Sequence, residues 1–463
     1  MVGVFIAVFG VLTWQQHSRY GTYGYDMGLY DQGIWLVSRF EEPFMTIRGL
    51  NYFAHHVNLI TLVFVPFYWL GAGPHLLVLT QTIVLGFGAV PVFLYARDKT
   101  DEWVALVPAL AYLLFPAVQW IDWWHFHPDA LIITPLLFAW WFYTRHNWKW
   151  FLITTLLALS CKEDAAIAVM VMGIVIAVRG DRKWGIQTFG IAALWYAIAT
   201  KLIIPIANGG GDPFYNDFFP GLGNSLPEIL VNMVLHPSRW LGPALQPMKK
   251  TYIWKLIAPV GGLALLAPLT LLIAVPQAIV NVVSNRLTAD IRFHYSSIIV
   301  VGVFIATVEA FAWIVKRGEW WRLGVAGFLV ITSAFANMAW SPSPLGAHHD
   351  AAWVKASPRY AIIDRAIKDF VEPSDAVSAN YNVITHLTHR RLAYQFPNPF
   401  QVFLWGVNDQ NPHSPNAANV LVLDTALLGE FEPLYKALVM PGGTFRIVFE
   451  EQGVVVARRV RPQ

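Results

Sequence analysis

The stretch SSIIVVGVFIATVEAFAWIV, residues 296–315, decides which class of protein this chain belongs to. Apart from Glu309 and a few hydroxyl side chains it is apolar, and it is long enough to cross the hydrocarbon core of a bilayer as a helix. Lipid offers no hydrogen-bond partners, so only a helix satisfies the backbone of such a segment. We therefore predict a transmembrane helix here.

Similar runs recur through most of the sequence. The chain has 463 residues, of which 56% are hydrophobic and only 13% charged, and its mean hydropathy is +0.47. Soluble proteins carry about 25% charged residues. We predict an all-α polytopic membrane bundle of about eleven transmembrane helices. The other ten runs are 2–14, 74–96, 103–118, 130–144, 150–161, 165–178, 184–206, 252–264, 265–283 and 322–340.

Charge and cysteine content exclude several classes of protein. The 32 basic and 29 acidic residues leave a net charge of +3 and form no long run of one sign, which argues against a nucleic-acid partner. The single cysteine, Cys161, excludes an intrachain disulfide and a Cys-based structural zinc site. Neither the composition nor a repeat indicates an oligomeric state.

Basic residues indicate which loops face the cytoplasm. The four short linkers 97–102, 145–149, 179–183 and 316–322 carry ten Lys or Arg, whereas the much longer opposite loops carry eight. By the positive-inside rule the short linkers are cytoplasmic. The long Trp- and His-rich loops and everything after Trp340 then face outward, as in a multi-pass plasma membrane protein.

Three segments need separate interpretation. Residues 57–70 are apolar but short and contain Pro66, so we predict an interfacial or re-entrant helix rather than a span. No charged turn separates the runs 252–264 and 265–283 near Ala264. If the two runs form one kinked helix, all later segments face the opposite side of the membrane. The glycine-rich segment 208–215 is suited to a flexible lid.

The tail predicts a second domain. A Ser-Pro-Ser-Pro linker at 341–344 is followed by helical spacing at 360–370 and by short β-like runs. We predict a transmembrane domain at 1–340, with its first outer loop at 15–73, and a small soluble extracytoplasmic α/β domain at 341–463. The β-like runs are 376–379, 420–423, 444–450 and 454–457.

The first outer loop contains the first candidate site residue. Asp26 follows a Tyr- and Gly-rich turn and precedes apolar residues at helical spacing. It is therefore either a carboxylate of a functional site or the N-cap of a helix. Asp31 lies five residues later, about 140° further round a helix, so the two carboxylates cannot face one pocket if the segment is helical.

The second outer loop reads Trp-Ile-Asp-Trp-Trp-His-Phe-His-Pro-Asp at 120–129. Pro128 favours an extended His127, and in an extended chain His125 and His127 project to the same side. With Asp129 they could bind sugar hydroxyls, phosphate or a divalent metal. The alternative is an aromatic belt with exposed histidines. The stacking faces predicted for a sugar are Trp120, Trp123 and Trp124.

Further ionisable residues lie next to apolar runs, where charges are costly and often functional. Lys162, Glu163 and Asp164 separate two runs, and their desolvation requires at least one ion pair. The alternative is a short polar turn without a functional role. Arg292 and His294 precede the run at 296–315, where snorkelling explains them nearly as well. His55 and His56 precede the predicted interfacial helix, and His56 is a candidate for substrate binding.

Several of these motifs occur together, in order, over about residues 20–397, and in this they resemble a bacterial family of multi-pass membrane proteins of unknown function. That family is similar in turn to the GT-C superfamily of integral-membrane glycosyltransferases, such as the protein mannosyltransferases. The motifs are 25–35, 127–129, 162–164, 293–295 and 375–379.

The resemblance implies a helical bundle whose first outer loop carries an acidic catalytic residue and interfacial helices. It also implies a polyprenyl-phosphate-linked sugar donor and often a soluble domain after the last span. Asp26 occupies the position of the first-loop acid, and 57–70 that of an interfacial helix. Many relatives carry paired acids in the first or second outer loop, where this chain has His125, His127 and Asp129.

These expectations combine into one mechanism. Asp26 would act as general base on the acceptor hydroxyl. The cations Lys162 and Arg292 would neutralise the departing phosphate. We expect metal-free transfer, with a divalent metal at His125, His127 and Asp129 as the alternative. The predicted donor-binding residues are Lys162, Glu163, Asp164, Arg292 and His294.

Two other functions remain open at this point. A transporter or flippase of lipid-linked glycans would need broken helices and charges near the bilayer midplane in paired repeats, which the sequence does not display. A non-catalytic membrane scaffold would bind a partner through the tail.

Overall fold

The computed structural model describes residues 1–463 except 210–217, 220, 224–225, 408–413 and 461–463. The lid predicted at 208–215 therefore lies almost entirely outside the described residues. Contacts divide the chain into two compact units. We call them the helical unit (Met1–Thr13, His56–Ile60 and Leu79–Ala352) and the tail unit (Trp14–His55, Thr61–Val78 and Trp353–Gln463).

This division differs from the sequence-based one. We assigned the first outer loop, 15–73, to the transmembrane domain, but most of it groups with the tail. The physical reason is hydrogen bonding between segments distant in sequence. The backbone N–H of Gly24 donates to the carbonyl of Tyr381 at 2.7 Å, and Thr46 Oγ1 donates to the carbonyl of Ala393 at 2.8 Å.

The helices of the described residues include four that are long and apolar enough to cross a membrane. A fifth is formed if α7 (Leu106–Leu113) and α8 (Pro116–Trp123), bent by 42°, count as one broken span. The expected number of eleven is not confirmed, because several predicted spans fold as shorter helices, such as α1 (Val2–Ser18). The four are Pro74–Arg97 (α5, Pro74–Phe87, with α6, Ala89–Arg97), Arg182–Ala207, His294–Val315 and Glu319–Trp340.

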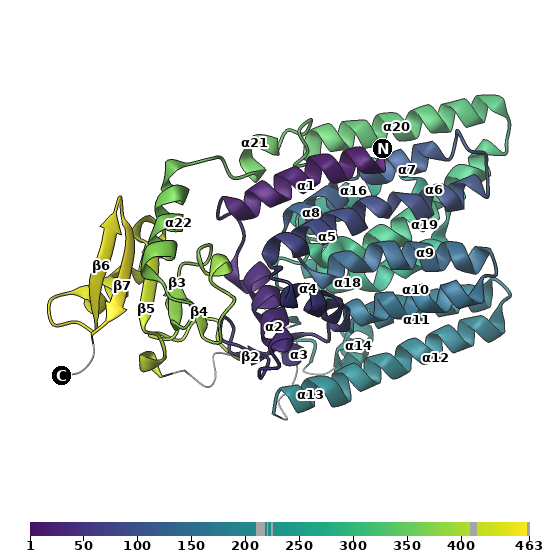
Figure 1. Cartoon of the computed structure of the whole chain (residues 1–463). Helices are drawn as coiled ribbons and strands as arrows, with labels where there is room; N and C mark the ends of the chain where they lie inside the picture. The colour runs from purple at the N-terminus through teal and green to yellow at the C-terminus, as the bar shows by residue number, and fades with distance from the viewer. Residues whose placement is uncertain (210–217, 220, 224–225, 408–413, 461–463) are drawn as a thin grey trace. The chain divides into compact units, whose positions relative to one another are not determined.

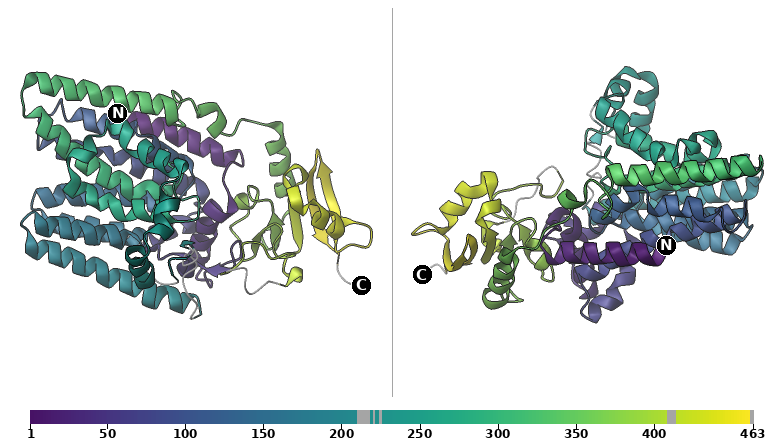
Figure 2. Two further views of the ribbon diagram at one scale, coloured as in Figure 1. Left: turned by 180° about the vertical axis from the view of Figure 1, so that it is seen from behind. Right: turned by 90° about the horizontal axis from the view of Figure 1, so that it is seen from above.

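Helix α19 (Ser297–Val315) is the most buried of these helices, and it contacts α9 (Ile133–Thr144) and α20 (Glu319–Trp340) (Figure 2). Its one charged side chain, Glu309, accepts hydrogen bonds from Tyr95 at 2.6 Å, Arg179 at 2.6 Å and Thr270 at 3.0 Å. A buried charge is tolerated only with such partners.

The uncharged junction near Ala264 is a break and not a continuous helix. Helix α16 (Pro247–Ile257) and a short 3-10 turn end at Gly261 and Gly262, whose φ angles are 61° and 73°. Residues with a Cβ rarely adopt this left-handed conformation, so the two glycines permit the reversal.

The apolar segment 57–70 does not form a long helix. It folds as a 3-10 turn at Leu59–Phe64, followed by α4 (Val65–Trp69) with Pro66 in its first turn. Leu62, Val63 and Leu70 are exposed. The prediction of a short apolar helix is confirmed, whereas its place at the membrane surface stays a prediction.

The tail unit contains a five-stranded sheet of order β4-β3-β5-β7-β6. The first three strands in this order are parallel, and the last three are antiparallel. The predicted helix is α22 (Pro358–Phe370), and all four predicted strands are present. The strands are β3 (Val377–Ala379), β4 (Ala393–Gln395), β5 (Val420–Asp424), β6 (Phe445–Glu451) and β7 (Val454–Arg459). In this sheet only β4, three residues long, was not foreseen, and the separate two-stranded pair of the tail unit, β1 (Phe44–Met45) and β2 (Leu50–Asn51), was not foreseen either.

Helices α11 (Ala165–Val178) and α12 (Arg182–Ile198) lie side by side in the helical unit (Figure 1). Glycines allow their close contact. A Cβ added to Gly185 would lie 2.5 Å from the carbonyl oxygen of Gly173 and 2.5 Å from the backbone nitrogen of Ala177. Small residues of this kind let helix backbones approach in membranes.

Replacing Gly185 should therefore force these helices apart. We expect Gly185→Ala to lower the melting temperature of the detergent-solubilised protein by several degrees. Gly190→Ala is the matched control, because it lies on the same helix with nothing within 4 Å of its added Cβ. The control should be neutral or raise stability by about 0.5–1 kcal/mol through helix propensity. Equal melting temperatures for the two variants would contradict this packing.

Candidate functional site

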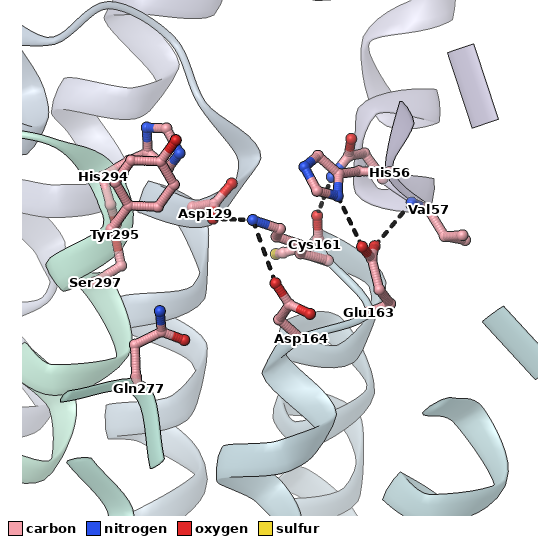
Figure 3. A network of polar contacts seen from close by, with 12 residues as sticks. His56, Val57, Asp129, Cys161, Glu163, Asp164, Gln277, His294, Tyr295 and Ser297 are labelled. Atoms are coloured by element: carbon pink, nitrogen blue, oxygen red, sulfur yellow. Dashed lines mark hydrogen bonds and ion pairs between the residues drawn. The ribbon is translucent and has the colours of Figure 1, made fainter. Parts of the chain in front are cut away.

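Ionisable side chains from four separate segments meet in the helical unit (Figure 3). His56 lies in the first outer loop, and Asp129 lies in the second. Lys162 and its two acidic neighbours separate α10 (Trp148–Cys161) from α11, and His294 precedes α19. The sequence named each of them a candidate site residue, but it did not establish that they would be neighbours.

The break between α10 and α11 turns these charges inward. Lys162 has an extended backbone (φ −165°, ψ 149°), so the helix does not continue through the triplet. Lys162 and Glu163 are buried, whereas Asp164 is partly exposed. The segment is thus a short turn, as the alternative interpretation had it, but its side chains form a buried polar network.

The central contact of this network is an ion pair. Lys162 Nζ lies 3.0 Å from Asp129 Oδ1 and 3.5 Å from Asp164 Oδ2. Burial alone would raise the pKa of Asp129, but the ammonium of Lys162 and the nearby imidazoles outweigh it and lower that pKa. The predicted need for an ion pair is confirmed.

Glu163 orients His56. One carboxylate oxygen lies 2.7 Å from His56 Nδ1, and the other accepts the backbone N–H of Val57 at 3.0 Å. Since Glu163 is fully buried, these contacts replace water. A carboxylate on one ring nitrogen selects the tautomer of a histidine and fixes the direction of its other nitrogen.

Two polar atoms at this site have no hydrogen-bond partner among the described residues: Asp129 Oδ2 and His294 Nδ1. Both residues are buried, and the ring of His294 stacks on that of His127 at 3.9 Å. Buried polar atoms without partners are uncommon and cost about 1–3 kcal/mol each. They mark places where the polar groups of a ligand would bind.

Gln81 of α5 holds the second loop in place. Its Nε2 donates to the carbonyl of Ile121 at 3.0 Å, and its Oε1 accepts from the backbone N–H of His127 at 2.8 Å. His127 is extended (φ −140°), as Pro128 predicts. His125 instead adopts a left-handed φ of 67°, so the extended chain from which we predicted a shared side for His125 and His127 does not include His125.

Other predicted ligands have structural partners. Trp120 is buried and donates to the carbonyl of Trp340 at 2.6 Å, so its ring has no open face for a sugar. Trp123 donates to the carbonyl of Ala352 at 2.8 Å, and the ring of Trp124 meets the ring of Phe293 edge-on at 4.4 Å.

Arg292 is not part of the network. Its guanidinium donates two hydrogen bonds to the carboxylate of Asp290, at 2.7 and 3.0 Å, and it is about half exposed. Arg292 and Asp290 pair with each other outside the buried network, so the donor-binding role predicted for Arg292 gains no support from the network.

A metal site is not preformed. Within the described ranges no three His, Cys, Asp or Glu side chains are arranged to hold a metal ion. This includes the set predicted from the sequence, His125, His127 and Asp129. The ammonium of Lys162 already occupies one oxygen of Asp129.

Asp26 lies in the tail unit, inside the π-helical turn Gly24–Gly28 that precedes α2 (Leu29–Ser38). The N-cap positions of these two elements are Tyr23 and Gly28, and neither makes a side-chain cap. Asp26 is therefore not the N-cap residue of either element.

Sequence reasoning missed the importance of Asp31. This carboxylate is fully buried in the tail unit, where it accepts hydrogen bonds from Tyr68, at 2.5 Å, and from Thr388. His389 Nε2 lies 3.2 Å away. The position of Asp31 within the apolar face of α2 was a signal of burial, but two of its three partners, Thr388 and His389, are more than 350 residues away.

Comparisons with known proteins give the family and the fold. A profile described as "Predicted membrane protein (DUF2079)" matches residues 17–456. The chain belongs to this family. No curated protein matches the sequence. The family assignment makes it a membrane protein and agrees with the resemblance inferred from the motifs.

Solved structures of GT-C glycosyltransferases share the fold of this family member. ArnT from Cupriavidus metallidurans in the apo state has a TM-score of 0.58, 14% identity, and coverage of 100% of this chain and 99% of that chain. The same enzyme bound to undecaprenyl phosphate has a TM-score of 0.55, with the same identity and coverage. The oligosaccharyltransferase AglB from Archaeoglobus fulgidus is less similar, with a TM-score of 0.42 and 14% identity. The match covers 99% of this chain and 74% of AglB, whose structure is a complex with an inhibitory peptide and a dolichol-phosphate.

The pair of Asp31 and His389 should make the stability of the tail unit depend on pH. Burial would lower the pKa of His389, but Asp31 outweighs burial and raises it above 6.5. A pKa raised by folding adds stability that is complete below the unfolded pKa and is lost as pH rises through the folded value.

We therefore expect the melting temperature to fall as the pH rises above 6.5, and His389→Gln to remove that part of the pH dependence. Thermal melts of the two proteins across this range measure it. His236→Gln, an exposed histidine of the helical unit, is the control. An unchanged pH slope in His389→Gln would exclude this contribution.

Proposed function

We propose that this protein is an integral-membrane glycosyltransferase that moves a sugar from a polyprenyl-phosphate donor to an acceptor outside the cytoplasm. The observation that carries the proposal is the buried network around Lys162 and Asp129, within a fold similar to ArnT. A structure of ArnT holds undecaprenyl phosphate, which is a lipid phosphate of the donor class proposed here.

The network suits a ligand that combines an anion with hydroxyl groups. An ammonium has three N–H donors, and among the described residues Lys162 makes one hydrogen bond, to Asp129 at 3.0 Å, while Asp164 lies 3.5 Å away. Lys162 can thus bind a phosphate oxygen while keeping Asp129. The unpartnered atoms Asp129 Oδ2 and His294 Nδ1 would bind sugar hydroxyls.

The proposed reaction is an inverting displacement at the anomeric carbon. Asp26 takes the proton of the acceptor hydroxyl while the acceptor oxygen forms a bond to C1. The bond between C1 and the phosphate oxygen breaks, and its electron pair leaves with the polyprenyl phosphate. Lys162 stabilises the negative charge that remains on that phosphate.

The location follows from the same proposal. A lipid-linked donor holds its scissile bond at the plane of the lipid headgroups, so the site must open there. We place the site and the tail on the outer face of the plasma membrane, because the arginine- and lysine-rich linkers favour the cytoplasm.

Replacing the proposed base tests the mechanism. Asp26→Asn keeps the shape of the side chain but cannot take the proton, so we expect transfer to fall by about 10²–10⁴-fold, as for loss of a general base. The measurement is the loss of polyprenyl-phosphate sugar from a panel of donors incubated with purified protein, together with a thermal melt.

Glu42→Gln is the matched control, because it removes an exposed carboxylate of the same loop. Both variants should melt as the wild type does, and only Asp26→Asn should lose transfer. An active Asp26→Asn protein would remove Asp26 from the mechanism, and a wild type that consumes no donor would overturn the proposed function.

A further inference from the structure

We infer that the carboxyl edge of the parallel strands in the tail unit is a carbohydrate-binding subsite for the acceptor, with Tyr381 and Tyr23 as its aromatic walls. This inference rests on the proposed function for its role in transfer. The ligand class itself follows from the side chains and the topology of the tail unit.

Topology indicates where a ligand would bind. The parallel strands have the order β4-β3-β5, so the chain leaves β3 for one neighbour and later returns to its other side. In open α/β sheets, ligands bind at the carboxyl ends of the strands beside such a reversal, which here are β3 and β5. Asn380 bridges this edge, because it accepts the backbone N–H of Asp424 and donates to its carbonyl.

The edge is aromatic and accessible. Tyr381 lies two residues after the end of β3, in a turn, and is 39% exposed. Its ring meets that of Tyr23 at a centroid distance of 5.2 Å and an angle of 64°. Two amphipathic rings at an angle offer an apolar face for the C–H groups of a pyranose and hydroxyl groups for its oxygens.

The same residues hold the proposed base. The carbonyl of Tyr381 accepts the N–H of Gly24 at 2.7 Å, and the carbonyl of Tyr23 accepts that of Asp26 at 3.2 Å. Burial, Tyr381 and Asp26 together raise the pKa of Tyr23, so the phenols stay protonated and can donate to a ligand. A sugar seated on the two rings therefore lies beside the carboxylate that would activate its hydroxyl.

A second observation also points to a hydroxyl-rich ligand. Gln395, the last residue of β4, is buried, and its Oε1 has no hydrogen-bond donor among the described residues. This oxygen faces Gly24, since a Cβ added there would lie 2.5 Å from it. Gly24 covers this unpaired acceptor, so a sugar hydroxyl would pair with it only if Gly24 moved away, and the accessible part of the subsite is the ring of Tyr381.

The test measures saccharide binding without catalysis. Saturation-transfer NMR on the full-length protein in nanodiscs, with a panel of methyl glycosides, should give a signal from at least one glycoside. Tyr381→Ala should lower that signal at least about tenfold, which corresponds to a loss of about 1.4 kcal/mol of binding free energy. Tyr381→Phe, which keeps the ring, should retain most of it.

Leu392→Ala is the matched control. Leu392 is 38% exposed, about as much as Tyr381, and it lies at the amino end of β4, away from the carboxyl ends of the strands. Hydroxyl-radical footprinting of the wild type gives a readout that does not depend on a variant folding, since the glycoside should protect Tyr381. No signal from any glycoside, or a full signal in Tyr381→Ala, would overturn the subsite. Donor consumption by the wild type without glycoside tests the proposed function separately.

Discussion

The polar network of the helical unit depends on one buried ion pair, between Lys162 and Asp129. Removing an ion from water costs several kcal/mol even after relaxation, and only close, well-directed partners offset that cost. The partners come from segments far apart in sequence, so the helices that carry them must be packed before the pair can form. An arrangement this costly is a weak source of stability, and the function proposed above assigns it to the binding of a ligand.

The tail unit adds a second constraint. The first loop folds with the tail and not with the apolar helices, because its polar groups find their hydrogen-bond partners there. Asp31 illustrates this, since this fully buried carboxylate of the loop is satisfied by Tyr68 of the same loop and by Thr388 and His389 of the tail. The tail is consequently part of the structure that positions Asp26. Any function assigned to the first loop then requires the tail as well.

Sequence reasoning predicted what depends on local pattern and missed what depends on distant contacts. Hydropathy predicted the apolar helices, and alternation with turn residues predicted four of the five strands in the larger sheet of the tail unit. Both signals lie within a few residues of sequence. It did not predict the number of long helices, because a short apolar run does not reveal whether it ends at a break such as Gly261. Charge at bilayer depth selected Lys162 and Asp129, but not their pairing. The aromatic side chain of Trp120 suggested a stacking face, and only its packing revealed that it is buried.

Lipid binding measured by native mass spectrometry tests the central claim most directly. Purified protein is incubated with undecaprenyl phosphate, and the lipid-bound fraction is compared between the wild type and the double variant Lys162→Met with Asp129→Asn, which removes both charges and leaves neither unpaired. Lys316→Met, in a linker expected to face the cytoplasm, is the control. Binding should fall at least about tenfold in the double variant, corresponding to about 1.4 kcal/mol, and stay unchanged in the control. Equal binding by all three proteins would contradict the assignment of this network to a lipid phosphate.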